Sequence, residues 1–142
     1  MTCSLSEITI SADLEKLYLL NGFIVHYAEA SGCDMTGINR VLLAVEEAFV
    51  NICRYAYPGH KGEVTVSCCL ENGSLVVVFA DKGIPFNMLS VPDPDISIGM
   101  DERSPGGLGI HFIRKLTSSV LYSRENGSNV LTLKFSCIRT TE

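Results

Sequence analysis

The segment Ser74-Leu-Val-Val-Val-Phe-Ala80 is nearly all apolar, and Asp81-Lys-Gly83 interrupts it at once. A short apolar run of this kind, ended by a turn signal, predicts a central β-strand that helices cover. Asn72-Gly73 stands directly before the run and is a strong signal for a two-residue hairpin turn. We therefore expect the run to pair with a strand over residues 63–70.

The rest of the chain is organised around this hairpin. A second Asn-Gly pair, Asn126-Gly127, predicts a last hairpin of strands over residues 119–123 and 130–137, and weak alternation over residues 4–10 predicts a short first strand. Apolar spacing predicts helices from an N-cap at Ser11 to about Ala30, from Thr36 to Tyr57 and from Gly109 to Leu116. Because hairpins join most strands and the helices are grouped, we expect an α+β fold. It would be a two-layer α/β sandwich, a mixed and mostly antiparallel sheet covered on one face by helices, in a single domain over residues 1–142.

Composition excludes several classes of protein. The net charge of -5 argues against direct nucleic-acid binding, which needs clustered Lys and Arg. No apolar run approaches the roughly 18 residues of a membrane span, and the first residues lack the basic start and apolar core of a secretory signal. We therefore expect a cytoplasmic protein whose six cysteines are reduced thiols. The histidines are scattered without metal-ligand spacing, so no zinc site is expected.

The second predicted helix carries polar residues away from its core stripe. Glu47, Asn51 and Arg54 follow one another at four- and three-residue intervals, so they share one face. Leu43, Ala44 and Val50 flank that face, and apolar residues beside a polar row indicate a ligand groove. The alternative is an ordinary outer face on which Glu47 pairs with Arg54 or Arg40, an interaction of little energy.

Two further segments have features that suit a nucleotide. Asp81 follows the apolar strand, where a carboxylate can accept a hydrogen bond from an exocyclic amine, and Gly83 would let a flat base approach the backbone. Gly106-Gly-Leu-Gly109 opens the third helix, whose N-terminus offers free N–H groups and a favourable dipole for phosphate. It is not a Walker loop, because no Gly-Lys-Ser/Thr follows. Each segment alone is also compatible with a plain turn.

Residues 87–105 lie between these two segments and show no periodicity. A structureless stretch of this length inside a compact domain is often a functional lid, and we expect a lid loop over the nucleotide. The alternative is a surface insertion without a role in binding.

In this order, the motifs resemble those of the bacterial anti-sigma-factor serine/threonine protein kinases. These belong to the wider ATPase family that includes histidine kinase catalytic domains, gyrase, Hsp90 and mismatch-repair ATPases. Glu47-Ala-Phe-Val-Asn51 looks like the N box of that family, and Asp81-Lys-Gly-Ile-Pro-Phe86 looks like its first glycine box. Gly106-Gly-Leu-Gly109 looks like its second glycine box, and Gly127-Ser-Asn-Val-Leu-Thr132 looks like its closing strand.

The resemblance implies a role for each matching residue. Glu47 would be the general base, Arg103 would meet the terminal phosphate, and Asn51 would bind Mg²⁺. The implied ATP-binding residues are Asn51, Arg54, Asp81, Gly83, Phe86, Gly106, Gly107, Leu108, Gly109 and Thr132. Among these, Asp81 would bind the adenine amine, and Thr132 would reach the base through water. The chain departs from the family at Arg54-Tyr55, where a histidine is frequent.

The resemblance also implies a function, with ATP and Mg²⁺ as cofactors. The protein would phosphorylate a small anti-sigma-factor antagonist and sequester a sigma factor, and it would form a homodimer, with the first strand and helix as the expected surface. One alternative is a nucleotide-gated protein-binding switch that performs no phosphoryl transfer. Another is a detached histidine kinase catalytic domain, which is disfavoured because no phosphoacceptor helix pair precedes the motifs.

Overall fold

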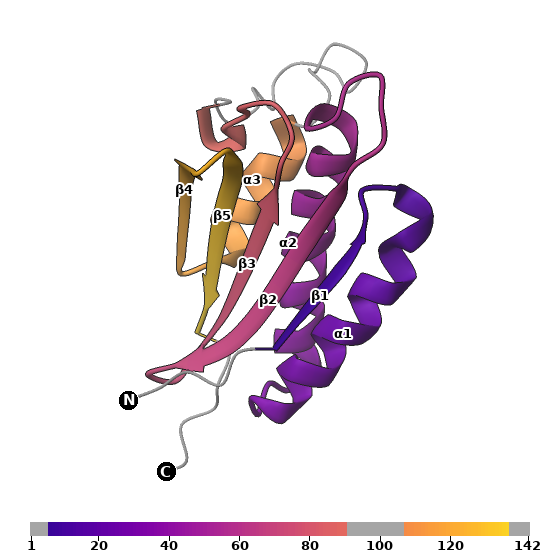
Figure 1. The fold of residues 1–142 in the computed structure, drawn as a ribbon. Coiled ribbons are helices and arrows are strands. Elements are labelled where there is room, and N and C mark those ends of the chain that lie inside the picture. Colours follow the sequence, from indigo (N-terminus) through magenta and orange to yellow (C-terminus); the bar gives the residue numbers. More distant parts are fainter. Residues whose placement is uncertain (1–5, 91–106, 137–142) are drawn as a thin grey trace.

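The computed structural model describes residues 6–90 and 107–136. It contains one five-stranded sheet in the order β1-β2-β3-β5-β4. The strands are β1 Ser6–Ser11, β2 Glu63–Glu71, β3 Ser74–Asp81, β4 Ser119–Glu125 and β5 Ser128–Phe135. The helices are α1 Leu17–Ala30, α2 Met35–Tyr55 and α3 Gly107–Leu116, with single 3₁₀ turns η1 Leu14–Lys16 and η2 Met88–Ser90. All three α-helices cover the same face of the sheet, and α2 lies between the other two (Figure 1).

The predicted fold class is confirmed, with one difference in the sheet. All four strand pairings are antiparallel, so the described sheet is not mixed. Both Asn-Gly pairs form the expected turns, with positive φ at Asn72, Gly73, Asn126 and Gly127, as a type I′ hairpin requires. The two tight hairpins force β2 against β3 and β4 against β5 in antiparallel pairs, and β5 then returns beside β3.

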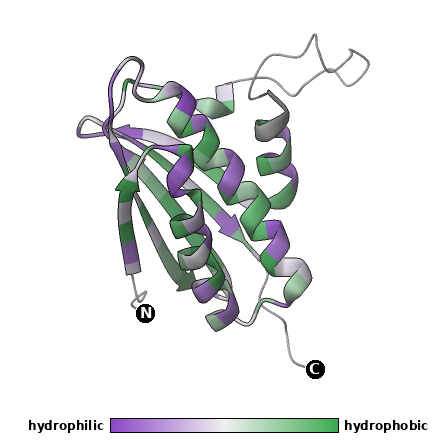
Figure 2. Cartoon of the chain, turned by 90° about the vertical axis from the view of Figure 1, so that its right-hand side faces the viewer, coloured by the Kyte–Doolittle hydropathy of each residue, from purple (hydrophilic) through white to green (hydrophobic). Residues whose placement is uncertain are grey.

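The hydrophobic core lies between the sheet and the helices. Alternate residues along the strands point toward the helices and pack against the buried faces of the helices. Figure 2 shows this hydrophobic interior in green. Its largest fully buried side chains include Phe49, Phe79, Leu133 and Ile113. On β5, the odd-numbered residues are buried and the even-numbered ones are partly exposed, which is the two-residue period of a strand with one covered face.

Several local expectations need correction. The first helical segment is capped by Asp13, whose side chain accepts from the Glu15 amide, and not by Ser11, which is the last residue of β1. The segment over residues 87–105 is not wholly irregular, because η2 lies within it. The remainder, residues 91–105, and with it the expected lid, lies outside the described residues. No helix in the described part of the chain is long and apolar enough to cross a membrane.

The cysteine prediction holds for two of the described residues and is wrong for two others. Cys53 and Cys68 are free thiols, whereas Cys33 and Cys69 are disulfide-bonded. Cys68 points into the core, and Cys69 points to the uncovered face of the sheet. Strand periodicity predicts these faces, but it carries no information on which sulfur atoms come together.

Candidate functional site

The candidate site lies where the C-terminal part of α2 meets the ends of β3 and β5 and the start of α3. Asn51 on α2 is buried with 3% of its surface exposed, and its side-chain amide donates to Met88 Sδ of η2 at 3.7 Å. Arg114 of α3 donates to the Leu89 carbonyl, so η2 is held between α2 and α3. The structure therefore fixes the segment after the first glycine box over the N-box asparagine.

Asp81 is the centre of a buried hydrogen-bond network. Only 4% of its surface is exposed. The Gly83 amide and the Asn129 side-chain amide both donate to its Oδ1, each at 2.9 Å. Among the described residues, no donor reaches its second carboxylate oxygen, Oδ2. A base that carries an exocyclic amine could donate to this oxygen.

Gly83 is required by a contact that the sequence did not indicate. A Cβ at this position would lie 2.2 Å from the Ala56 carbonyl oxygen and 2.6 Å from the Ala56 Cβ. The end of β3 thus closes directly against the C-terminus of α2, where the Ile84 amide donates to the same Ala56 carbonyl at 2.8 Å. The absent side chain therefore serves helix–strand packing, whatever its effect on the approach of a base.

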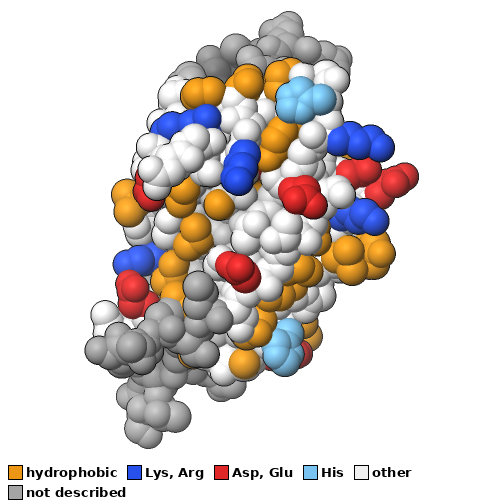
Figure 3. Space-filling model, viewed as in Figure 1, with side chains coloured by type: hydrophobic (Ala, Val, Ile, Leu, Met, Phe, Trp, Pro, Cys, Tyr) orange, Lys and Arg blue, Asp and Glu red, His pale blue; other side chains and the backbone are white. Residues whose placement is uncertain are grey.

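The structure places Thr132 away from this network. Thr132 of β5 pairs with Val78 of β3, and its neighbours Leu131 and Leu133 are the residues that face the core. Its side chain therefore lies on the uncovered face of the sheet, opposite to Asp81. Figure 3 looks onto this uncovered face, where hydrophobic side chains are interspersed with polar ones. The two-residue period of the strand separates the Thr132 side chain from Asp81. The expected contact of Thr132 with the base through water stays a prediction.

Asn129 is the residue that sequence reasoning missed. It lies directly opposite Asp81 in the register of β3 and β5 and is 5% exposed. The signal was present in the sequence, because Asn126-Gly127 fixes the start of β5 and Leu131, Leu133 and Phe135 mark its core-facing parity. Asn129 shares that parity, and Thr132 does not.

Glu47 has the environment of a proton acceptor. Burial, then the neighbouring Glu46, raise the pKa of its carboxyl above the 4.5 of an unperturbed glutamate, and Arg54 partly offsets this rise. Among the described residues, no ion pair joins Glu47 to Arg40 or Arg54. The structure therefore does not contain the alternative outer helix face on which Glu47 pairs with one of these arginines. Ala44 is fully buried, and so does not line an open groove as expected.

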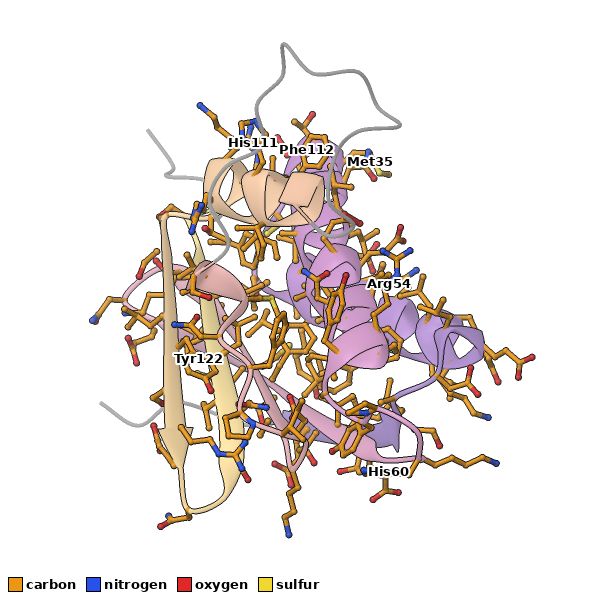
Figure 4. All side chains as sticks on the ribbon, turned by 90° about the horizontal axis from the view of Figure 1, so that it is seen from above. Met35, Arg54, His60, His111, Phe112 and Tyr122 are labelled. Carbon is orange, nitrogen blue, oxygen red and sulfur yellow. The ribbon has the colours of Figure 1, made fainter. Side chains whose placement is uncertain are left out.

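Arg54 is exposed and lies at the edge of a separate hollow. A cavity of about 540 Å³ is lined by Arg54 together with Asp13, Lys16, Cys53, His60 and Lys61, among others. Figure 4 shows Arg54 on the side of α2 that lies away from Tyr122. Tyr122 donates a hydrogen bond to Asn129. The structure therefore does not bring the Arg54 side chain to the Asp81 end of the site.

The phosphate-binding candidates are described only in part. Gly107, Leu108 and Gly109 form the first turn of α3, so their backbone N–H groups stand at a helix N-terminus. Arg103 and Gly106 lie outside the described residues. Phe86 lies beside Tyr55, with ring centroids 5.1 Å apart, and its amide donates to Asn129 Oδ1 at 3.1 Å. Phe86 thus continues the network around Asp81.

The described side chains suit Mg²⁺ only if phosphate groups of a nucleotide also bind the ion. Within the described residues, no cluster of three or more His, Cys, Asp or Glu side chains could hold a metal ion. Asn51 donates through its amide nitrogen to Met88, and no described donor reaches its Oδ1. A hard cation that keeps its waters and is shared with a nucleotide needs few protein oxygens. Asn51 Oδ1 therefore fits that role.

Comparison with known proteins gives consistent results. Residues 10–135 match the sequence family described as the histidine kinase-like ATPase domain. The chain is 28% identical over 133 residues to the serine-protein kinase RsbW of Bacillus cereus strain AH187, covering 91% of this chain and 83% of that one. Its identity to the serine-protein kinase RsbW of Bacillus mycoides strain KBAB4 is 26%, with the same coverage.

A solved structure has the same fold. It is a crystal structure of RsbU and RsbW domains of a Mycobacterium tuberculosis protein, and it matches with a TM-score of 0.68 at 17% identity. The match covers 98% of this chain and 34% of that one, so this chain spans about a third of the length of the solved mycobacterial chain. The resemblance inferred from the motifs is confirmed by these relatives.

Proposed function

The chain belongs to the histidine kinase-like ATPase domain family, and from this premise we propose that it is an ATP-dependent serine/threonine protein kinase. The observation that carries the proposal is the position of Glu47, a half-buried carboxylate with a raised pKa, one helical turn before the buried Asn51. The relatives named serine-protein kinase RsbW support the same class of reaction.

The candidate site residues have separate parts in the proposed reaction. Asp81 Oδ2 accepts a hydrogen bond from the adenine amine, and the first turn of α3 donates N–H groups to phosphate oxygens. Asn51 would hold Mg²⁺ through Oδ1, and the bound ion would neutralise phosphate charge. The hydroxyl oxygen of the substrate serine or threonine attacks the γ-phosphorus, the bond to the β-phosphate oxygen breaks, and ADP leaves. Glu47 takes the hydroxyl proton, a role that a raised pKa suits.

We propose a small anti-sigma-factor antagonist as the phosphorylated partner and a sigma factor as the sequestered one, in the cytoplasm. This follows the resemblance of the N box and the two glycine boxes. Incubation of the protein with γ-labelled ATP and candidate antagonist proteins, followed by phosphosite mapping, tests the proposal. We expect label on a serine or threonine of the antagonist. ATP binding without any transfer would contradict the kinase and would support the alternative, a nucleotide-gated binding switch.

A homodimer is also proposed. Helix α1 has no charged residue between Leu17 and Ala28, and Leu14 and Tyr18, beside and on it, are 50% and 67% exposed. A helix that is apolar on its outer side as well as its inner side is typical of an interface. Sedimentation of the wild-type protein and of Tyr18→Asp measures the oligomeric state of each. A monomeric wild type would contradict the dimer.

A further inference from the structure

The Asn129 side chain uses its whole hydrogen-bonding capacity inside the protein. Its Nδ2 donates to Asp81 Oδ1 at 2.9 Å and to the Ile84 carbonyl at 2.8 Å. Its Oδ1 accepts from the Phe86 amide at 3.1 Å and from the Tyr122 hydroxyl at 2.5 Å. A primary amide has two donors and one oxygen with two acceptor sites, so all of them are engaged. Asn129 therefore has no donor or acceptor left for a ligand.

These bonds determine how Asp81 is presented. Asp81 Oδ1 accepts from Gly83 on its own strand end and from Asn129 on the neighbouring strand. Two donors on one oxygen, from two directions, fix the rotation of the carboxylate about its terminal bond. The other oxygen, Oδ2, is then held in one position, and the cost of ordering it is met when the protein folds.

We propose that Asn129 is a positioning residue that determines selectivity for adenine, because it orients Asp81 so that Oδ2 meets the exocyclic amine of the base. The inference rests on the proposed ATP-binding function. It gives Asn129 a role through Asp81, without direct contact with the nucleotide.

Strand β4 supports the same arrangement. Tyr122 donates its hydroxyl to Asn129, and Arg124, which pairs directly with Asn129 in the hairpin, donates from Nη1 to the Gly83 carbonyl at 2.8 Å. Residues from both strands of the β4–β5 hairpin thus hold the turn after Asp81. Asn129 also holds Ile84 and Phe86, so the residues that follow Asp81 are fixed by the same amide that orients its carboxylate.

A comparison of two nucleotides tests the role. ATP and purine riboside 5′-triphosphate differ only in the exocyclic amine, and their affinities are measured by calorimetry with the full chain. The wild-type protein should prefer ATP by roughly tenfold to a hundredfold, the value of a hydrogen bond to a charged group. In Asn129→Ala this preference should fall toward one, because ATP affinity drops much more than affinity for the analogue.

Two further variants make the result interpretable. Val130→Ala truncates the next side chain on the same strand, which points to the other face, and it should keep the preference. Asn129→Asp keeps the shape and the two accepted bonds but places an oxygen against Asp81 Oδ1, and it should lose the preference even if the alanine variant is unstable. Thermal unfolding checks that each variant is folded.

Two outcomes would overturn the inference. If Asn129→Ala or Asn129→Asp is folded and weakens both nucleotides equally, with the ATP preference intact, Asn129 has a structural role only. If the wild-type protein itself binds both nucleotides equally, the proposed contact between Asp81 and adenine fails, and the role of Asn129 fails with it.

Discussion

The two ends of the candidate site are held in different ways. At the base end, Asp81 and Asn129 are almost fully buried and lie in a continuous network that joins three strands and the C-terminus of α2. At the catalytic end, Glu47 is half-buried and accepts no hydrogen bond from the described residues. The base end is organised before any ligand arrives, whereas Glu47 keeps its acceptor sites for a substrate. Recognition and chemistry should therefore respond separately to substitution.

The largest expected effect is on catalysis. Glu47→Gln removes the proton acceptor and leaves the base end untouched, so the transfer rate should fall on the order of 10²–10⁴-fold with ATP affinity unchanged. Single-turnover transfer to the antagonist and ATP calorimetry measure the two quantities. Glu46→Gln changes the adjacent, partly buried carboxylate and is the matched control. An undiminished transfer rate in Glu47→Gln would remove Glu47 from the base role.

A smaller effect is expected at the base end. Asp81→Asn keeps the volume, but with Oδ1 still facing Gly83 and Asn129 it presents an amide donor to the adenine amine. ATP affinity should fall by roughly 1.5–3 kcal/mol, while transfer at saturating ATP changes little. Calorimetry and saturation kinetics separate the two. A variant that loses transfer but keeps ATP affinity would contradict the proposed division between the two ends.

The packing of the base end gives a third, stability-based prediction. Gly83→Ala forces a methyl group into the Ala56 carbonyl and should destabilise the fold by roughly 1–3 kcal/mol. Gly22 on α1 has no atom within 4 Å of an added Cβ. Gly22→Ala should therefore stabilise by about 1 kcal/mol through helix propensity. Urea unfolding compares the pair, and equal stabilities would show that the Ala56 contact is not tight.

The smallest effect is expected in the pH dependence of transfer. Glu47 must be ionised to accept a proton, so the rate should fall as the pH drops through its pKa, which burial places above 4.5. Arg54 lowers that pKa, so Arg54→Ala should move the acid limb of the profile to higher pH. The shift is small because Arg54 is exposed and screened. A limb that moves to lower pH would contradict the assignment.

The fold was largely predictable because its signals are local. The apolar run before Asp81, the two Asn-Gly turns and the helical spacing each depend on neighbouring residues, and hairpins leave few ways to order the strands. The antiparallel character of the whole sheet was not predicted, because it depends on β5 returning beside β3 after a long connection.

The sequence motifs indicated the positions of the candidate site residues only in part, and the roles of these residues stay predictions. Asp81 and Asn51 take buried positions consistent with their predicted roles. Thr132 was assigned from a motif without regard to strand parity, and Asn129 was overlooked for the same reason. The function of Gly83 in packing against Ala56 could not be read at all, because the two residues meet only in the folded chain.

Strand β5 is the last strand among the described residues, yet it lies inside the sheet, between β3 and β4. During synthesis, β3 therefore keeps an unpaired edge, and Asp81 lacks its amide partner, until the ribosome has released the residues beyond Gly127. A chain stalled or cleaved before that turn would contain Glu47, Asn51 and the first turn of α3, but its base end would be incomplete. Under the proposed function, nucleotide occupancy would thus distinguish chains in which β5 has paired with β3 from nascent or truncated ones that lack β5.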